Sequence, residues 1–460
     1  MEPLTLQFIA DACGGTLRGR PELVVRGVCT DSRKVRAGDL FVALRGERFD
    51  GHDFLNEAAG RGAVAALVAA GRDAGALPRV EVDDTMRALA AIAGVYRKRF
   101  AATAIAVGGS NGKSSVKELL ASVLRQRFVV LWNEASYNNI IGVSHTLLRL
   151  EKSHQILVQE VGTNHPGELA PLLRLVQPRF AVLTGIGREH LEFFGDLHGV
   201  VEEEGTLAEA VPTDGELFTV GGNPLVEEAA RRCKGSVTRI GWGEGNKWQI
   251  LSVRLDERGS TFAVSAPRPE LSGEYRVNLL GRHQVANAVL ALAVGAELGL
   301  GREELARGLA ECAPLKMRLQ LREVAGVRIL DDAYNANADS MLAALQTLAD
   351  FPCSGRRIAV LGDMNELGVH TDAAHREVGE AAARAGVDFL CAVGAHAAVT
   401  AEAARKAGLG DVCAFASVED AATGLKKQMH AGDVVLIKAS RAARLERIVE
   451  MLNCRDSVRL

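Results

Sequence analysis

Short apolar segments alternate with longer amphipathic segments through the middle of the chain. The apolar segments have the length and the β-branched content of buried strands, and they lie at residues 104–109, 154–162 and 180–187. Residues 112–127, after the first of them, have the periodicity of a helix. This alternation predicts a parallel sheet with helices on both faces, whose ligands bind at the carboxyl ends of the strands. A β-rich stretch at residues 248–266 interrupts the pattern before a helix over residues 283–298.

The two flanking parts show related patterns. The first part combines a helix with short period-2 stretches broken by Ser, Gly and Asp, and the helix over residues 85–100 leads out of it. The last part repeats the strand–helix alternation without a glycine-rich loop, with strands expected at residues 327–332, 357–363, 389–394 and 433–439. We therefore expect an α/β protein of three domains, at residues 1–84, 85–313 and 314–460.

Composition narrows the class of protein. The 460 residues carry 54 basic and 57 acidic side chains, and aromatic residues make up 5%, which argues against nucleic acid or anionic lipid as a partner. Glu2 and Pro3 stand where a signal peptide would be basic, and no apolar run reaches the roughly 20 residues of a membrane span. The eight cysteines form no C-x-x-C pair, which favours small buried side chains in a reducing compartment. We expect a soluble cytoplasmic protein.

The segment AIAVGGSNGKSS, residues 104–115, is the strongest candidate for chemistry. Gly109 and Gly112 allow a tight turn and close approach of a ligand, and the N–H groups from Ser110 onward lead into a helix N-terminus. Lys113 adds a positive charge for phosphates, and the hydroxyl of Ser114 or Ser115 is suited to Mg²⁺. The strict phosphate-loop pattern has glycine where this chain has Val107, so an ordinary strand-to-helix turn remains the alternative.

Other polar residues follow expected strands. Glu160 ends its strand beside the loop and is a candidate Mg²⁺ ligand or a surface acid, and His190 is a candidate metal ligand or a packed side chain. Asn138 and Asn139 are suited either to bind substrate amides or to cap a helix.

Asp331 and Asp332 close a strand of the last part. They could hold ribose hydroxyls or a reacting group, or have no functional role. In the polar run that follows, Asp339 or Ser340 would cap a helix.

These motifs together resemble the Mur ligase family, the ATP-dependent enzymes that form the amide bonds of the peptidoglycan stem peptide. The resemblance extends over nearly the whole chain, through DSRKVRAGDLFVALRGERFDGHDF, GGSNGKSSVKELL, YNNIIGVSHTLLRL, QEVGTNHPGEL, REHLEFFG, RHQVANAV, MRLQ, DDAYNANADSM, LGDMNELG and KASRAARLE. DDAYNANADSM and LGDMNELG are the most discriminating, and they resemble the members that add D-alanyl-D-alanine to UDP-N-acetylmuramoyl-tripeptide. A D-N-P-R motif and an H-N-P motif, typical of two other branches, are absent.

The resemblance implies a fold and a set of roles. The fold is a small N-terminal α/β domain, a central phosphate-loop ATPase domain with a parallel sheet, and a C-terminal Rossmann-like domain. ATP would contact the loop residues Gly109, Ser110, Asn111, Gly112, Lys113, Ser114 and Ser115, with Asn287 near adenine and Arg318 and Asp332 at the γ-phosphate and ribose. Ser114 and Glu160 would hold one Mg²⁺, and His190 would help hold a second.

The resemblance also implies where the other substrates bind. The UDP-sugar end would be held by Ser32, Arg33, Phe49, Asp50 and His52 in the first part. Tyr334, Asn335 and Asn337, with the LGDMNELG loop, would shape the D-alanyl-D-alanine side. A monomer suits a chain whose site lies between its own domains.

Two positions depart from the family pattern. The residue before Gly109 is commonly threonine but is Gly108 here. Fourteen residues after the metal histidine these ligases usually have a lysine that CO₂ carbamylates, and here that position is Glu204. We expect the Glu204 carboxylate to replace the carbamate as a metal ligand, directly or through water, which would remove dependence on CO₂; the alternative is a weakened second metal site.

Three alternatives remain open from the sequence. The nearest is another carboxylate–amine ligase of the superfamily that acts on a different acceptor, which the amine that releases phosphate from ATP would distinguish. A phosphate-loop hydrolase would release phosphate from ATP without any muramoyl peptide. A non-catalytic nucleotide-binding scaffold would bind ATP and form no amide bond.

Overall fold

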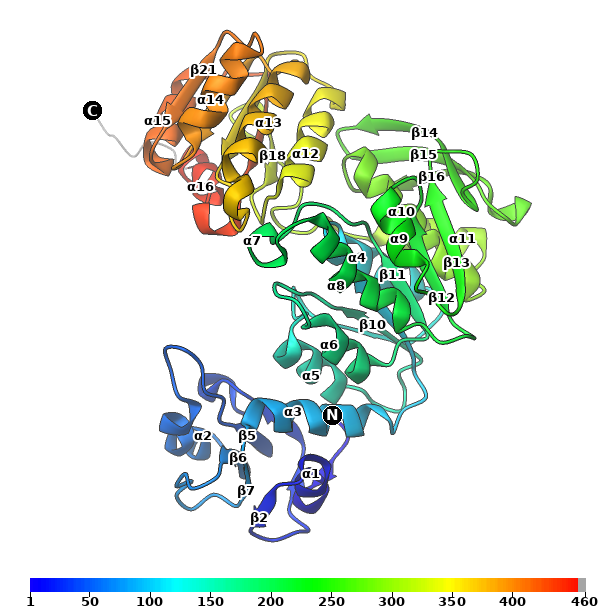
Figure 1. Ribbon diagram of the computed structural model, residues 1–460, viewed down its shortest axis with the longest axis vertical. Coiled ribbons are helices and arrows are strands. Elements are labelled where there is room, and N and C mark those ends of the chain that lie inside the picture. The colour runs from blue at the N-terminus through cyan, green and yellow to red at the C-terminus, as the bar shows by residue number, and fades with distance from the viewer. Residues whose placement is uncertain (454–460) are drawn as a thin grey trace.

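The computed structural model describes residues 1–453, which form three parts that follow one another along the long axis of the molecule (Figure 1). Cys454 lies outside the described residues. The other seven cysteines are free thiols, and Cys29, Cys312 and Cys391 are buried. None of the helices within residues 1–453 is both long enough and apolar enough to cross a membrane.

The first part contains a five-stranded sheet in the order β2-β7-β6-β5-β4, in which only the β2–β7 pair is antiparallel. Its strands are β1 (Leu4–Thr5), β2 (Thr16–Arg18), β3 (Val24–Val25), β4 (Gly27–Cys29), β5 (Asp39–Val42), β6 (Ala65–Ala69) and β7 (Arg79–Val82). Its helices are α1 (Leu6–Cys13), α2 (Leu55–Gly60) and α3 (Thr85–Arg97), with short 3-10 turns η1 (Ser32–Lys34) and η2 (Gly51–Phe54).

The central part is built on a nine-stranded sheet in the order β16-β15-β14-β13-β12-β11-β8-β10-β9. The strands are β8 (Thr103–Gly108), β9 (Val130–Trp132), β10 (Ile156–Glu160), β11 (Phe180–Leu183), β12 (Glu216–Val220), β13 (Ser236–Gly241), β14 (Trp248–Asp256), β15 (Gly259–Ser265) and β16 (Gly273–Val277). Strands β8 to β14 pair in parallel, whereas β14, β15 and β16 are antiparallel, so the predicted β-rich stretch extends the same sheet.

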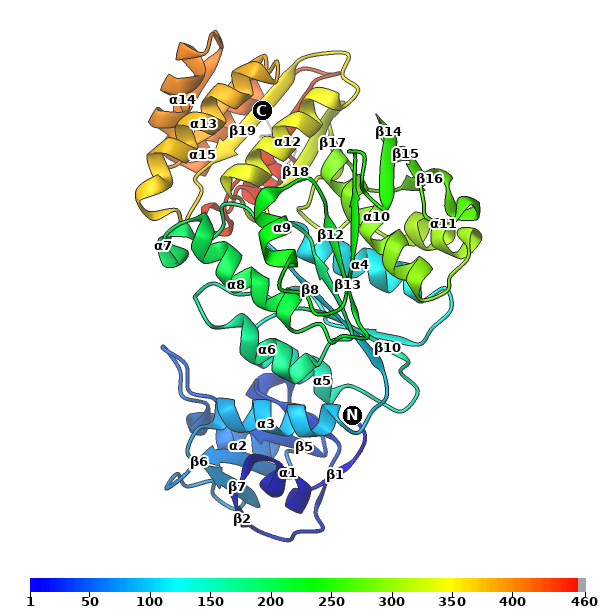
Figure 2. The ribbon, with the colours of Figure 1, turned by 45° about the vertical axis from the view of Figure 1, so that its right-hand side comes forward.

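Helices cover both faces of this sheet, as the alternation predicted. The helices are α4 (Lys113–Leu124), α5 (Ile140–Leu148), α6 (Leu169–Val176), α7 (Leu191–Phe194), α8 (Leu197–Glu209), α9 (Pro224–Ala230), α10 (Arg282–Glu297) and α11 (Arg302–Glu311), with η3 (Pro269–Leu271). One apolar core contains residues of α4, α10 and α11, and another contains residues of α5, α6 and α8. The second of these cores continues into the first part of the chain through α3, which lies between the N-terminal strands and α5 and α6 (Figure 2).

Two buried side chains near the end of α3 fix the connection between these parts. The Tyr96 hydroxyl donates to the carbonyl of Leu150 at 2.7 Å, and the Arg97 guanidinium donates to the carbonyls of Val176, Phe100 and Ala102 at 2.9–3.2 Å. Because a buried carbonyl without a partner is costly, these bonds make the connection a rigid joint.

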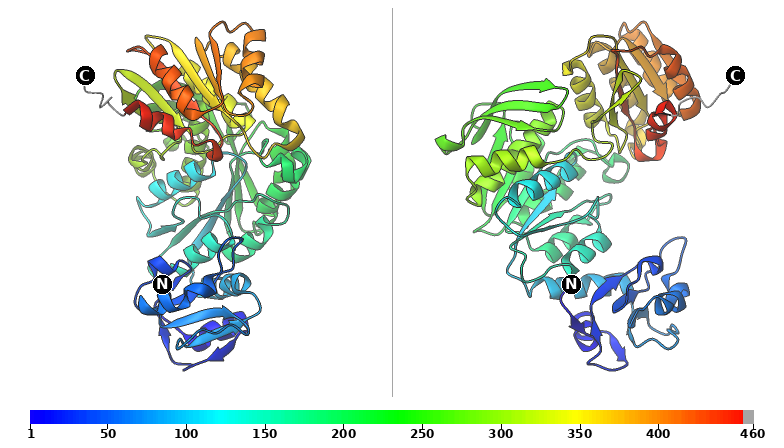
Figure 3. Two further views of the ribbon diagram at one scale, coloured as in Figure 1. Left: turned by 90° about the vertical axis from the view of Figure 1, so that its left-hand side faces the viewer. Right: turned by 180° about the vertical axis from the view of Figure 1, so that it is seen from behind.

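The last part, coloured yellow to red in Figure 3, has a six-stranded sheet in the order β17-β18-β22-β19-β20-β21, parallel except for β17. Its strands are β17 (Gln320–Val324), β18 (Val327–Asp332), β19 (Arg357–Gly362), β20 (Phe389–Val393), β21 (Val412–Phe415) and β22 (Val434–Lys438). Its helices are α12 (Ala338–Asp350), α13 (Thr371–Arg384), α14 (Ala397–Lys406), α15 (Val418–Gln428) and α16 (Glu446–Asn453), with η4 (Gly368–His370) and η5 (Arg441–Ala443). The four strands expected here are present, and β17 and β21 are added to them.

Candidate functional site

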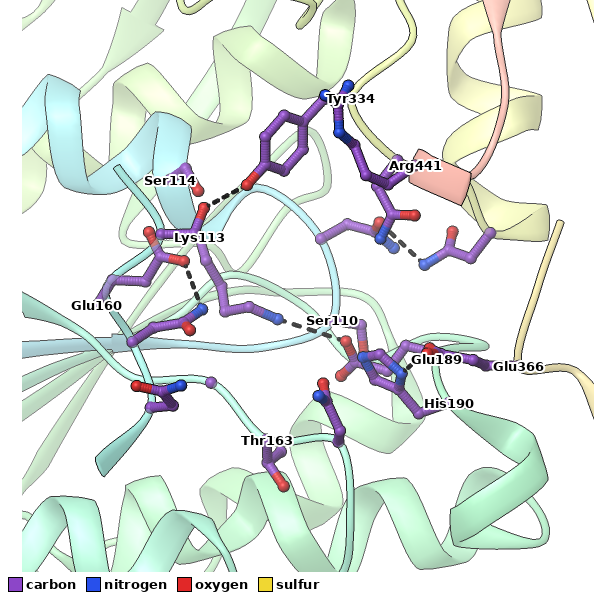
Figure 4. Close-up of a pocket in the computed structure, with 18 of the residues that line it drawn as sticks. Ser110, Lys113, Ser114, Glu160, Thr163, Glu189, His190, Tyr334, Glu366 and Arg441 are labelled. Atoms are coloured by element: carbon purple, nitrogen blue, oxygen red, sulfur yellow. Dashed lines mark hydrogen bonds and ion pairs between the residues drawn. The ribbon is translucent and has the colours of Figure 1, made fainter. Parts of the chain in front are cut away.

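A cavity of about 1140 Å³ lies where the carboxyl edges of the central and C-terminal sheets face each other (Figure 4). Its lining includes most of the polar residues that the sequence singled out, namely Ser110, Asn111, Gly112, Lys113, Ser114, Asn138, Asn139, Glu160, His190, Arg318, Tyr334, Asn335 and Asn337. Residues from three of the expected strand ends and from the C-terminal sheet therefore share one cavity.

The phosphate loop joins β8 to α4 with a backbone that requires glycine. Gly109 has a φ of 111°, and a Cβ there would lie 2.6 Å from Thr184 Oγ1 and 2.8 Å from the carbonyl oxygen of Gly185. Gly112 has a φ of 90° immediately before α4 begins. Val107, which departs from the strict pattern, is a buried strand residue and so lies outside the turn.

Lys113 lies among three carboxylates. Its ammonium donates to the carbonyl of Gly109 at 2.5 Å and lies 3.4 Å from Glu189 Oε2. Burial alone would lower the pKa of Lys113, but Glu189, Glu204 and Glu160 outweigh it, and the pKa is raised. A cation that remains charged at the start of a helix is suited to bind phosphate. The sequence analysis did not predict Glu189 as a site residue, because an acidic residue next to His190 in a loop looks like an ordinary surface residue.

Glu160 is held at the end of β10 with one oxygen free. Its Oε1 accepts from Asn138 Nδ2 at 2.9 Å, and its backbone N–H donates to Asn133 Oδ1 at 2.8 Å. The residue is 1% exposed, and Oε2 has no hydrogen-bond partner among the described residues. An unpaired buried carboxylate oxygen facing a phosphate site is what a divalent cation would bind.

Glu204 projects from α8 beneath the phosphate loop and is not among the residues that line the cavity. It is 1% exposed, and neither of its oxygens has a hydrogen-bond partner within residues 1–453. Burial, followed by the nearby charge of Glu189, raises the pKa of Glu204 to about 8. A Cβ on Gly108 would lie 2.9 Å from Leu207 Cδ2 and 3.3 Å from Glu204 Oε2. The two departures from the family pattern are therefore neighbours in space.

His190 meets a carboxylate from the C-terminal part. Its Nδ1 lies 2.5 Å from Glu366 Oε2, and the backbone N–H of Glu192 donates to the carbonyl of Glu366 at 3.0 Å. Both His190 and Glu366 have positive φ, 48° and 61°. In metal sites a histidine commonly binds the ion through one ring nitrogen and donates the other to a carboxylate.

Within residues 1–453, no three His, Cys, Asp or Glu side chains are grouped so that they could hold a metal ion by themselves. Mg²⁺ at nucleotide sites usually takes one or two protein ligands and completes its shell with phosphate oxygens and water. Glu160, Glu189 and Glu204 surround a single lysine, and each has at least one oxygen without a hydrogen-bond partner among the described residues. The raised pKa of Glu204 reflects burial and the charge of Glu189, a repulsion that a bound divalent cation would relieve. These residues therefore fit a site that binds Mg²⁺ together with ATP.

The remaining predicted nucleotide residues lie around the loop. Asn287 packs on Gly112, where a Cβ would be 2.8 Å from Asn287 Oδ1. The Arg318 guanidinium lies 4.3 Å from the ring centre of Tyr334 and donates to Ser114 Oγ at 3.4 Å.

Two residues of the predicted nucleotide site, and Asp331 at the end of β18, also lie outside the cavity wall. Ser115 is buried 3.4 Å from Gln284 Nε2, and Asp332 is paired with Lys438 at 2.7 Å. Asp331 is buried at the end of β18 beside Arg322, at 3.2 Å. Like Gly109 and Asn287, the residues Ser115, Asp331 and Asp332 do not line the cavity.

The five residues predicted to bind the UDP-sugar do not line this cavity. Ser32 donates to Glu57 Oε2 at 3.0 Å, Arg33 pairs with Asp31, and Phe49 is 73% exposed. Asp50 Oδ1 lies 2.5 Å from His52 Nδ1, and His52 Nε2 accepts from the backbone of Ala69. All five lie in the N-terminal part, below the cavity.

Two helix caps were considered in the sequence, and one of them differs from the expectation. Asn139 caps α5 through its side chain, which is the structural alternative given for it. Asn337 caps α12 in a capping box with Ser340, so the prediction that Asp339 or Ser340 is the cap was wrong. Asp339 instead pairs with Arg188 of the central part at 2.6 Å, because α12 begins against the loop after β11.

The C-terminal part is held on the central part by polar contacts around the cavity. Arg188 contacts both Asp339 and Glu377, and Tyr334 and Ser136 share a hydrogen bond of 2.7 Å between their hydroxyls. Asn337 Nδ2 donates to Asn111 Oδ1 at 3.1 Å. The structure therefore has the two parts closed around the site.

Three family models match the chain. They are the Mur ligase family, catalytic domain (residues 24–97), the Mur ligase middle domain (residues 107–295) and the Mur ligase, glutamate ligase domain (residues 317–441).

Known proteins match over the full length. The chain is 36% identical to the UDP-N-acetylmuramoyl-tripeptide–D-alanyl-D-alanine ligase of Escherichia coli, over 98% of this chain and 99% of that protein. A crystal structure of MurF from Acinetobacter baumannii superimposes with a TM-score of 0.90 at 30% identity, covering 98% and 99% of the two chains. MurF ligase from Thermotoga maritima in complex with ADP superimposes with a TM-score of 0.82 at 29% identity, covering 93% and 97%.

Proposed function

The chain belongs to the Mur ligase family, and on this premise we propose that it joins D-alanyl-D-alanine to UDP-N-acetylmuramoyl-tripeptide at the expense of ATP. The reaction supplies a peptidoglycan precursor and releases ADP and phosphate. The observation that carries the proposal is the phosphate loop with Lys113 among three carboxylates, facing a cavity closed by a third domain. We place the domain boundaries near residues 84 and 313.

The first step is attack of the tripeptide carboxylate on the γ-phosphate of ATP, which gives an acyl phosphate. Lys113 and the N–H groups of residues 109–115 neutralise and orient the phosphates, and Arg318 approaches the transferred group from beside Ser114. Asn287 and Asp332 hold the adenosine end. No protein nucleophile is needed, since charge neutralisation and positioning suffice.

Mg²⁺ would be held by Ser114 and Glu160 at one position and with help from His190 at a second. When bound, it disperses charge on the transferred phosphoryl group. Asn138 keeps Glu160 oriented, and Glu366 does the same for His190.

Glu204 provides the anionic oxygens that a carbamylated lysine provides elsewhere in the family. Glu204 and Gly108 are neighbours, since a Cβ on Gly108 would lie 3.3 Å from Glu204 Oε2 and 2.9 Å from Leu207 Cδ2, so we treat the two departures from the family pattern as a pair. On this proposal the enzyme has no requirement for CO₂.

In the second step the amine of D-alanyl-D-alanine attacks the acyl carbon and phosphate leaves from a tetrahedral intermediate. Tyr334, Asn335 and Asn337 of the C-terminal part shape this side of the cavity. Closure of that part excludes water, which would otherwise hydrolyse the acyl phosphate. Residues 313–317 connect the two parts and would act as the hinge.

The UDP-sugar end is held by the N-terminal part around Ser32, Arg33, Phe49, Asp50 and His52. Phe49 is suited to this because it is exposed on the loop before Asp50. A single chain contributes all three parts of the site, which favours a monomer. Because the proposed reaction consumes ATP, we place the enzyme in the cytoplasm.

The experiment is phosphate release from ATP and Mg²⁺ with UDP-N-acetylmuramoyl-tripeptide, with and without D-alanyl-D-alanine, in ordinary and in CO₂-depleted buffer. Release that requires both substrates and yields the pentapeptide nucleotide is expected, at an equal rate in the two buffers. Release indifferent to both substrates would indicate a hydrolase, and binding of ATP without release would indicate a scaffold. A rate that falls in CO₂-depleted buffer would contradict only the proposed role of Glu204 and would leave the proposed ligase activity standing.

A further inference from the structure

We propose that Arg441 binds the carboxylate of the incoming D-alanyl-D-alanine and so determines which amines the enzyme accepts. This inference rests on the proposed function. It names a residue that sequence reasoning did not single out, at the start of η5 on the C-terminal wall of the cavity.

The first argument is the supply of positive charge. The dipeptide carries a carboxylate at the end opposite its reacting amine, and a carboxylate taken from water needs a cationic or multiple N–H partner. Within residues 1–453, four lysines and arginines line the cavity, Lys113, Arg318, Lys438 and Arg441.

Three of these cations are committed elsewhere. Lys113 is surrounded by carboxylates at the phosphate loop, and Arg318 lies over Tyr334 with its guanidinium at Ser114. The Lys438 side chain is 3% exposed, and its ammonium is paired with Asp332 at 2.7 Å and donates to the carbonyl of Asn335 at 2.9 Å. Arg441 remains, with a side chain that is 55% exposed.

The second argument is that hydrogen bonds hold the backbone next to Arg441 in place. The preceding residue, Ser440, is buried; its hydroxyl accepts from the N–H of Asn365 at 2.9 Å and lies 3.1 Å from the carbonyl of Ala336. The N–H of Ser440 donates to the carbonyl of Asp363 at 2.9 Å. These bonds tie together the loops that follow β18, β19 and β22.

The guanidinium is held at one nitrogen and has the others available. Arg441 Nη1 lies 3.0 Å from Glu446 Oε1 and 3.5 Å from Met317 Sδ, whereas Nε and Nη2 have no partner within residues 1–453. The side chain extends toward Tyr334 in Figure 4. An arginine offers five N–H donors in a planar fork, so the free edge can take a carboxylate in a bidentate manner.

The third argument is the chemistry of the wall beside Arg441. The carboxamides of Asn335 and Asn365 are exposed to the cavity and have no hydrogen-bond partner among the described residues. They suit the peptide group of the dipeptide, and Ala442 leaves room for its methyl groups. The wall therefore matches a small dipeptide with a free carboxylate.

The test compares D-alanyl-D-alanine with its C-terminal amide, D-alanyl-D-alaninamide, in the full-length enzyme and in Arg441→Gln and Arg441→Lys. In the unmodified enzyme we expect the KM of the amide to exceed that of the dipeptide by about 10- to 100-fold, the usual effect of losing a charge-assisted hydrogen bond. Arg441→Gln should raise the KM of the dipeptide by a similar factor and abolish the preference, and Arg441→Lys should restore part of it. The KM values of ATP and the UDP-tripeptide should stay within about twofold.

Arg444→Gln is the matched control, since it makes the same change on the same turn at an exposed residue that does not line the cavity. Melting temperatures of all variants show whether they are folded. An Arg441→Gln enzyme that still prefers the dipeptide over its amide would overturn the inference, as would an equal rise in the KM of all three substrates. If the unmodified enzyme forms no amide bond with either compound, the proposed function itself fails.

Discussion

Arg188 is predicted to control how firmly the C-terminal part closes on the site. Its guanidinium donates to Asp339 Oδ1 at 2.6 and 3.0 Å and also pairs with Glu377, while its backbone N–H donates to Asp339 Oδ2 at 2.7 Å. The arginine lies in the loop after β11, and its partners lie on α12 and α13. Replacing Arg188 by Gln removes the ionic contacts and leaves the backbone bond.

The magnitude follows from the exposure of these groups. The arginine side chain is 27% exposed and both carboxylates are 36% exposed, so water screens the pairs and the contact is worth about 1–3 kcal/mol rather than the larger value of a buried network. That free energy corresponds to a change of about 5- to 150-fold in the ratio of closed to open molecules. The hydrogen bonds of Asn337 and Tyr334 to the central part remain.

The assay is small-angle X-ray scattering of Arg188→Gln with ADP and Mg²⁺, together with steady-state kinetics. We expect a larger radius of gyration and a raised KM for D-alanyl-D-alanine, with ATP binding unchanged because the phosphate loop is intact. Arg384→Gln is the control, because Arg384 pairs with Glu380 along α13 on an exposed surface. Scattering and KM values equal to those of the control would refute the assignment of closure to Arg188.

Three further predictions concern the loop, the replaced lysine and the thiols. Gly109→Ala should abolish ATP binding in an isothermal titration, because its Cβ would clash with Thr184 and with the backbone of Gly185; retained affinity would mean that the loop can rearrange. Glu204→Gln should lower kcat by about 100-fold or more. The double variant Glu204→Lys with Gly108→Thr should be active only with added bicarbonate. If this double variant is equally active without bicarbonate, the proposal that Glu204 replaces the carbamate is contradicted. Burial raises the pKa of both Cys312 and Cys391 to about 12, so at pH 9 almost none of either thiol is ionised in the folded protein; mass spectrometry should find these two unlabelled by iodoacetamide until the protein is unfolded, and rapid labelling of the native protein would contradict their burial.

Local pattern predicted the parts of the site that depend on local structure. Lys113, Glu160 and His190 each follow an apolar strand, and parallel strands bring their carboxyl ends to one edge whatever the rest of the chain does. Arg188 and Asp339 are 151 positions apart and meet only through the docking of two sheets, which no periodicity encodes.

The residues that were missed or misjudged show the same limit. Glu189 lies in a loop and is buried near Lys113 and Glu204, an environment that only the folded chain creates, so its acid had no distinguishing pattern in the sequence. The α12 cap was misplaced by two or three residues because Asn, Asp and Ser are all good caps and all three occur there. Counting from His190 located Glu204, but only the structure placed it next to Gly108.

The rigid joint at Tyr96 and Arg97 allows the enzyme to select the length of the peptide on its nucleotide-sugar substrate. It fixes the N-terminal part relative to the phosphate loop, so a nucleotide-sugar anchored at one end presents its peptide carboxylate at a set distance from the γ-phosphate. A peptide one residue shorter would end before the reacting position, and one residue longer would overrun it by about 3.5 Å. The choice of a tripeptide over its precursors then depends on side chains that contact no substrate, and loosening the joint would relax this selectivity without altering any binding residue.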